Sequence, residues 1–125
     1  MDLDESILAS IKQMLGIIEE VKAFDDEITA HINSTFISLR QLQAIDPKST
    51  FSIHGYAETW RDLGDDVRLI DPIRSYIYLN VRLLFDPPAS STISEAYRQR
   101  LAEIEWRMTV EAETLAAQAE EGAAG

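Results

Sequence analysis

The stretch that decides the fold runs from Asp71 to Ser91 and reads DPIRSYIYLNVRLLFDPPASS. Its apolar residues recur at helical spacing, at Ile73, Ile77, Val81 and Leu84, and this stripe is widened by Tyr76, Leu83 and Phe85. A helix that is apolar over much of its girth is normally the central helix of a small domain. The sequence therefore predicts that the other elements of the chain pack around this segment.

Proline marks both ends of this central helix. We prefer a start near Asp71, because its carboxylate can cap free backbone amides and Pro72 suits the first helical position. The alternative is one helix that starts at Asp66 and bends at Pro72. We expect the helix to stop at Asp86-Pro87-Pro88, since proline has no backbone N–H and the residue before a proline avoids helical dihedrals.

Two further helices are predicted before the central one. The first covers residues 4–16, with Asp4 or Ser6 as its cap, and its apolar residues are Ile7, Ile11, Met14, Leu15 and Ile18. The second begins at the acidic step Phe24–Asp26 and ends at Asp46-Pro47. Its stripe consists of Ile28, Ile32, Phe36, Leu39 and Leu42.

A long loop, residues 47–66, separates the second helix from the central one. Residues 51–53 alternate apolar and polar, which is compatible with a brief extended piece, and residues 59–63 are compatible with a single helical turn. Trp60 in this loop either seals the core or contacts a partner. We favour the core, because large aromatic side chains are usually buried.

A last helix is predicted from Thr92, which is placed to form a capping box with Glu95. Its seam follows near-heptad spacing through Ile93, Tyr97, Leu101, Ile104, Met108 and Leu115. Glu103 and Arg107 stand at i,i+4 and are expected to form an ion pair.

The end of the chain, EAETLAAQAEEGAAG, has high helical propensity but little apolar area to bury. We therefore expect one helical domain over residues 1–110 and an acidic tail over residues 111–125. Such a tail frays or is disordered in isolation, or becomes ordered on a partner.

The predicted fold class is all-α: a small bundle of four main helices plus short helical turns, with a long loop between the second and third helices. At 125 residues the chain is one domain with a real core. The absence of cysteine favours a reducing compartment. The acidic N-terminus is unlike a signal peptide, and no apolar run approaches the roughly 20 residues of a membrane span. We expect a soluble, intracellular protein without membrane contact.

The net charge of −11 argues against ordinary nucleic-acid binding, which requires clustered Lys and Arg against phosphate. It is compatible with solubility alone, and also with a surface along which DNA slides without sticking.

No stretch of the sequence carries a recognisable catalytic pattern. It has no phosphate loop, no Gly-x-Ser-x-Gly and no His-Glu-x-x-His. Glu27 and His31 share a helix face, but two ligands are too few for a metal site. The acids of residues 25–27 lack the spacing of a calcium loop and are explained as helix-start acids. We expect no enzyme, no catalytic residue, no metal and no cofactor.

Several segments resemble the small head-tail connector proteins of tailed bacteriophages, also called adaptor or head completion proteins. They lie at residues 6–16, 24–33, 39–42, 59–60, 76–88 and 103–107, with the Asp-Pro-Pro step and the closing Glu-Trp-Arg as the most specific parts. The sequence departs from the family pattern at Gln43, where a glycine is expected after the second helix, and in its longer acidic tail.

This resemblance implies a structural protein of the virion. Such proteins are helical bundles that assemble as a ring, commonly a dodecamer, beneath the portal protein in the neck between capsid and tail. They extend the DNA channel, through which the genome passes without specific binding, and they present a surface to the next neck, stopper or tail protein. Assembly would take place in the host cytoplasm.

The resemblance also suggests which residues contact partners. In the loop, Trp60 and Arg61 are candidates for the adjacent subunit or the next neck component. Near the C-terminus, Trp106, Arg107 and the tail from Glu111, including Leu115, are candidates for the portal, because aromatic and Arg side chains are the usual interface anchors.

The alternative function is a small acidic helical interaction module that binds a host protein, for example by mimicking nucleic acid. Mimicry would gather the acids on one exposed face, whereas here they are spread over helix starts and the tail.

Overall fold

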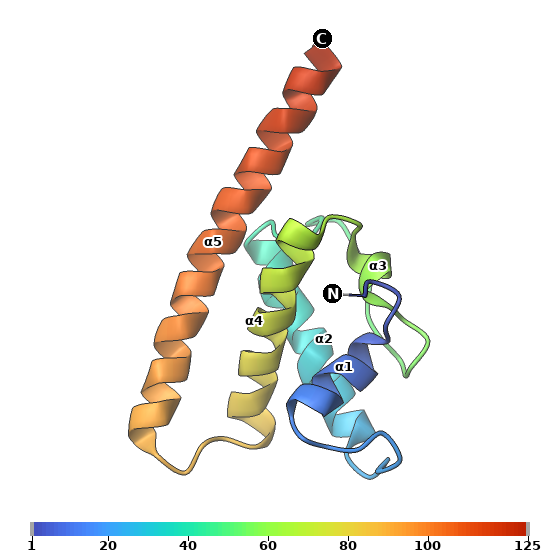
Figure 1. Cartoon of the computed structure of the whole chain (residues 1–125), viewed down its shortest axis with the longest axis vertical. Coiled ribbons are helices and arrows are strands. Elements are labelled where there is room, and N and C mark those ends of the chain that lie inside the picture. Colours follow the sequence, from blue (N-terminus) through green and yellow to red (C-terminus); the bar gives the residue numbers. More distant parts are fainter. Residues whose placement is uncertain (1, 125) are drawn as a thin grey trace.

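A computed structural model describes residues 2–124 of the chain, and every regular element in that range is a helix (Figure 1). The helices are α1 (Ile7–Met14), α2 (Asp25–Gln41), α3 (Trp60–Leu63), α4 (Val67–Phe85) and α5 (Ser91–Ala124). The predicted all-α class is confirmed, and α3 is the single turn expected in the long loop. The β-bridge found in residues 2–124 is an isolated one between Ser6 and Thr59.

α4 is the central helix, packed against α1 and α2 on one side and against α5 on the other (Figure 1). Three residues of its predicted stripe are fully buried: Ile73, Ile77 and Val81. The fourth, Leu84, is exposed, so its assignment to the stripe is wrong. In this last turn Phe85 packs instead, edge-on against Phe24 with ring centroids 5.3 Å apart.

α4 begins at Val67, so the preferred start near Asp71 is wrong and the alternative start at Asp66 is correct. The Asp66 carboxylate caps the helix by accepting the N–H of Arg68 at 2.9 Å. Pro72 consequently lies inside the helix, in its second turn, where the missing N–H removes one backbone hydrogen bond. At the other end Asp86 is the C-cap, as the Asp-Pro-Pro step predicts.

α1 and α2 are joined by a turn at Gly16, which has a positive φ of 81°. Ser6 caps α1, as predicted, since its Oγ accepts the N–H of Ala9 at 3.2 Å. All four central positions of the α2 stripe are buried, namely Ile28, Ile32, Phe36 and Leu39.

α2 ends at Gln41, about one turn before its predicted stop. Gln43 makes the turn with a φ of 60°, in the left-handed region that favours glycine. Its N–H donates to the carbonyl of Arg40, and the N–H of Ala44 donates to the carbonyl of Leu39, both at 3.0 Å. This pair of bonds closes the helix, which explains why a glycine is expected at position 43.

The long loop is held on both sides. The side-chain amide of Asn33, on α2, donates to the carbonyl of Ile53 at 2.9 Å, while its oxygen accepts the N–H of Ile53 at 2.8 Å. The N–H of Arg61 donates to the carbonyl of Leu3 at 2.8 Å. These contacts fix residues 51–61 against α2 and the N-terminal residues, although residues 51–53 form no strand.

α5 packs on α4 through its predicted seam, in which Ile104 and Met108 are buried while Ile93 is half-exposed. The helix is capped by Ser90, whose Oγ accepts the N–H of Ile93 at 3.4 Å. The capping box assigned to Thr92 is therefore wrong, because α5 begins one residue before it, at Ser91.

One predicted contact in the second half of α5 is wrong. Glu103 forms an ion pair with Arg100 at 3.0 Å rather than with Arg107. The helix also continues unbroken past residue 110 to Ala124, and its end projects beyond the body of the bundle (Figure 1). Within residues 2–124, no helix has both the length and the apolar character needed to cross a bilayer.

Candidate interaction surfaces

Trp60, at the start of α3, is fully buried. Its indole Nε1–H donates to the Ser10 hydroxyl at 3.0 Å, and that hydroxyl donates to the carbonyl of Ser6 at 2.8 Å. The side chain thus joins α3 to α1 and fills the space between them, which confirms that Trp60 seals the core. Its indole is not accessible to another chain unless α3 moves, so a contact role for Trp60 itself would be indirect.

Arg61, the next residue, has its side chain on the surface. Its Nε donates to the Asp4 carboxylate at 2.7 Å, and this hydrogen bond holds the pKa of Asp4 below its ordinary value. Of the two residues predicted in the loop, Arg61 is therefore the one that a partner can reach.

A buried polar cluster beside α3 escaped the sequence analysis. Lys12 on α1 lies 2.8 Å from the Asp25 carboxylate, and its Nζ donates to the Tyr56 hydroxyl at 2.7 Å and to the carbonyls of Val21 and Glu19 at 2.6 and 3.1 Å. The Tyr56 hydroxyl in turn donates to Asp25 at 2.7 Å. The cluster ties together α1, the loop after it, the start of α2 and the 51–59 segment.

The electrostatics of this cluster favour the charged forms of Lys12 and Asp25. Burial opposes the charges of Lys12 and Asp25, but their mutual hydrogen bond and Tyr56 outweigh it. The pKa of Lys12 is therefore raised and that of Asp25 lowered. A catalytic lysine or carboxylate is tuned in the opposite direction, toward neutral pH. One feature of the sequence could have indicated that Lys12 is buried: it stands four residues after Leu8, on the buried side of α1.

Metal ligands do not converge in the part of the chain that the structure describes, where no group of three or more His, Cys, Asp or Glu side chains is placed to hold an ion. The predicted pair on α2 is present, with His31 Nε2 at 3.7 Å from Glu27 Oε1.

Trp106 lies on the outer side of α5, and 69% of its surface is exposed. Beside it runs a groove of about 410 Å³ between the start of α4 and the middle of α5, which we call the α4/α5 groove. Its walls include Trp106, Arg107 and Glu111 from the predicted set, together with Arg68, Asp71 and Arg100, which sequence reasoning missed. Leu115, one turn further along α5, is half-buried and does not line it.

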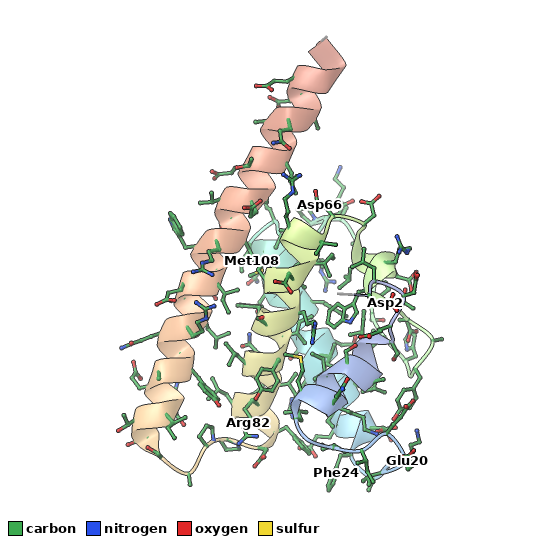
Figure 2. The ribbon with its side chains drawn as sticks, in the orientation of Figure 1. Asp2, Glu20, Phe24, Asp66, Arg82 and Met108 are labelled. Carbon is green, nitrogen blue, oxygen red and sulfur yellow. The ribbon has the colours of Figure 1, made fainter. Side chains whose placement is uncertain are left out.

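A second groove, of about 610 Å³, lies along α1 and the loop that follows it, and we call it the α1 groove. Its charged walls are acidic: Glu5, Glu19 and Glu20. Ile18, on the same wall, is 67% exposed. Figure 2 shows Glu20 on this loop, across the body of the molecule from Met108 on α5.

A family model described as "Phage connector protein" matches residues 7–114 of the chain. The chain belongs to the phage connector family. This confirms the resemblance drawn from the sequence, and it makes the protein a structural component of a phage particle. Neither a curated protein nor a solved structure matches the chain significantly.

The match covers nearly all of this connector's body and most of α5, so it includes Arg61, Trp106, Arg107 and Glu111. Leu115 and the projecting end of α5 lie beyond it. The α4/α5 groove lies wholly within the matched range, while the α1 groove reaches just outside it at Glu5 and Ser6.

The connector's α4 and α5 are joined by a polar bond as well as by their apolar seam. The Tyr76 hydroxyl donates to the Glu105 carboxylate at 2.9 Å. Burial, with the help of Glu105, raises the pKa of Tyr76 to about 12. Glu105 directly precedes Trp106 in the sequence. The hydrogen bond therefore helps to hold α5 in the rotation in which Trp106 is exposed.

Proposed function

We propose that this connector forms a ring beneath the portal of a tailed phage, lies in the neck of the virion and extends the DNA channel toward the tail. The observation that carries the proposal is the family match over residues 7–114. The fold is in keeping with it, because a ring needs two different patches on each subunit that meet head to tail. Arg61 and the α1 groove lie on one side of the bundle, and α5 lies on the other (Figure 1).

The charge of the chain suits a channel. Each subunit carries a net charge of −11, and a ring multiplies this charge around its lumen. A negative lumen repels the phosphate backbone and lowers the affinity of the wall for DNA, so the genome passes without specific binding. We propose that the ring assembles on the portal in the host cytoplasm, before the tail joins.

The projecting end of α5 is the part of the chain best placed to reach the portal. Glu111 still lies beside α4 and Leu115 is half-buried, but the residues from 116 to 122 are all exposed where the helix leaves the bundle (Figure 1). Trp106 and Arg107 lie lower, beside α4, at the level where a neighbouring subunit would stand. Arg61, on the opposite side, is available to the adjacent subunit or to the next neck, stopper or tail protein.

The test is an affinity pull-down of the tagged full chain from virus-producing cells, with identification of the bound proteins by mass spectrometry. We expect a portal protein and other neck components in comparable amounts, and imaging of the purified complex should show a ring. A matched variant that ends at residue 116 should lose the portal while still folding. Recovery of one host protein without virion proteins would overturn the proposal and favour an acidic interaction module.

A further inference from the structure

Among the residues that the structure describes, the two most exposed large apolar side chains stand on opposite sides of the bundle. Trp106 is 69% exposed beside the α4/α5 groove, and Ile18 is 67% exposed on the wall of the α1 groove. A single exposed apolar side chain does not by itself require a partner, but a tryptophan followed by an arginine is the usual composition of an interface anchor. An anchor on one side of the bundle and a groove on the other suit one contact made twice, once with each neighbour.

The two grooves differ in charge: the α4/α5 groove has three arginines together with Asp71 and Glu111, whereas the charged residues of the α1 groove are all carboxylates. Of the three arginines that line the α4/α5 groove, Arg68 pairs with Asp66 and Arg100 with Glu103. Arg107, directly after Trp106, forms no ion pair with any side chain that the structure describes, residues 2–122. A free guanidinium next to an exposed indole is the composition of an interface anchor.

The α1 groove presents the matching features. Its charged residues are three carboxylates, and neither Glu19 nor Glu20 forms an ion pair with the described side chains. Its volume of about 610 Å³ is within the usual range of about 300–1,000 Å³ for sites that enclose a partner group. Ile17 and Ile18 supply apolar wall for an aromatic ring.

We propose that Trp106 of one copy inserts into the α1 groove of the next copy, where it packs on Ile18 while Arg107 pairs with Glu19 and Glu20. This rests on the proposed ring and assigns its subunit contact. The occupant is a second copy because the chain is strongly acidic, so attraction between copies requires its rare exposed cations to meet its acids. The contact is head to tail, and a head-to-tail contact closes into a ring when the rotation between copies allows it.

Cysteine crosslinking tests this contact, because the sequence contains no cysteine. Gln13 lines the α1 groove and Ala102 lies beside Trp106, and both are exposed and uncharged. Full-length Gln13→Cys and Ala102→Cys chains are mixed, assembled on the portal and oxidised mildly. We expect at least about tenfold more mixed dimer than from Ala30→Cys with Ala102→Cys, in which the first cysteine sits on the exposed side of α2. Equal yields, including no crosslink in either mixture, overturn the assignment.

A charge exchange gives a second readout. Arg107→Glu alone, and Glu19→Arg with Glu20→Arg, should each lower the crosslinked yield about tenfold, and the combination should restore most of it. Arg98→Glu and Glu27→Arg, exposed positions outside both grooves, are the controls and should change nothing. Failure of the combination to restore the yield overturns the pairing.

The failure of this inference can be told apart from failure of the proposed function. A ring seen by imaging without the Gln13–Ala102 crosslink rejects the contact and leaves the connector role standing. A crosslink from Gln13→Cys to another neck protein, in place of a second copy, also rejects it. Absence of both ring and portal rejects the proposed function.

Discussion

The chain contains the dipeptide Trp-Arg twice, and the two copies have opposite fates. Trp60 is fully buried under α3 and bonded to Ser10, while Trp106 is 69% exposed on α5. Each tryptophan is followed by an arginine that faces solvent, Arg61 and Arg107. The difference lies in what surrounds them: α3 is a single turn folded over α1, whereas α5 already buries Ile104 and Met108 on its other side. The same residues therefore make a core seal in one region and an unpartnered surface in the other.

The largest expected effect is that of Trp60→Ala, which tests whether Trp60 is part of the core. We expect a loss of about 3–5 kcal/mol in the free energy of unfolding, because the change leaves a large cavity and removes the partner of the Ser10 hydroxyl. Denaturant unfolding followed by circular dichroism measures it. Trp60→Phe should lose distinctly less, since it keeps most of the ring. A loss below about 1 kcal/mol would mean that α3 is not part of the core.

Lys12→Met tests the polar half of the same region. We expect a loss of about 3 kcal/mol, because the Asp25 carboxylate, which is mostly buried, is left without its counter-charge. Lys22→Met is the control: Lys22 lies 4.1 Å above the Tyr56 ring, and its loss should cost about 1 kcal/mol or less.

The pH dependence of stability gives the cluster a second test. Because the pKa of Asp25 is lowered from 3.8, its contribution is present above about pH 4 and is lost as the pH falls through the folded value. Because the pKa of Lys12 is raised from 10.5, its contribution is present below that pH and is lost as the pH rises further. In Lys12→Met, the unfolding midpoint should show neither the loss of stability at acid pH nor the loss at alkaline pH. If the loss at acid pH is the same in the variant and the native protein, the Lys12–Asp25 pair does not contribute as proposed.

Tyr76→Phe tests the hydrogen bond that joins α4 to α5, the helix on which Trp106 lies. Removing the hydrogen bond to Glu105 should cost about 1–2 kcal/mol at neutral pH. Because the pKa of Tyr76 is raised to about 12, the native protein should also lose stability as the pH rises from 10 to 12, and the variant should lose less there. Tyr78→Phe is the matched control, because Tyr78 is only partly buried. Equal alkaline curves for native protein and Tyr76→Phe would contradict the assignment.

Gln43→Gly concerns a residue that is exposed, like Trp106, but is constrained by its backbone conformation. Its φ of 60° is costly for a residue with a Cβ, so glycine should raise the free energy of unfolding by about 1 kcal/mol. Gln41→Gly, inside the last turn of α2, should lower it by about 0.5–1 kcal/mol. Thermal melts of the two variants should shift in opposite directions, and shifts of the same sign would refute the left-handed turn.

Trp106→Ala should have the smallest effect on folding, within about 0.5 kcal/mol of the native protein, because 69% of the residue's surface is already exposed. The same variant should nevertheless reduce the crosslink between copies as strongly as Arg107→Glu. If Trp106→Ala lowers the free energy of unfolding as much as Trp60→Ala does, Trp106 contributes to the core as Trp60 does.

Local patterns in the sequence were sufficient for most of the stripes of α2 and α4, although not for Leu84, and for the stop at Asp86 and the burial of Trp60, since each depends on spacing or on residue type. The start of α4 was misplaced because Asp66 and Asp71 are equally good caps, and only packing against α2 and α5 decides between them. The continuation of α5 past residue 110 was underestimated because its Ala-rich sequence forms helix without burying much area.

The parts that were missed depend on contacts between distant residues. Lys12 and Tyr56 are 44 positions apart in the sequence, and the residues around each give no indication that the two side chains are in contact. The two grooves are likewise made by elements that only the fold brings together, so Arg68 and Arg100 gained their place beside Trp106 only in three dimensions.

The pairing of the N-terminal residues with residues 56–61 also sets the order in which the chain can fold. α1 leaves the ribosome first, but its partners follow 44 to 57 positions later, as in the contacts Lys12–Tyr56, Trp60–Ser10 and Arg61–Asp4. At about 5–20 residues per second, α1 must wait roughly 2 to 11 seconds for these partners to be synthesised. α4 and α5 are joined by a short link, so these two helices can pack together as soon as both are synthesised. Folding on the ribosome is therefore expected to begin with α1 packed on α2 only, while the side of α1 that contacts residues 56–61 stays uncovered.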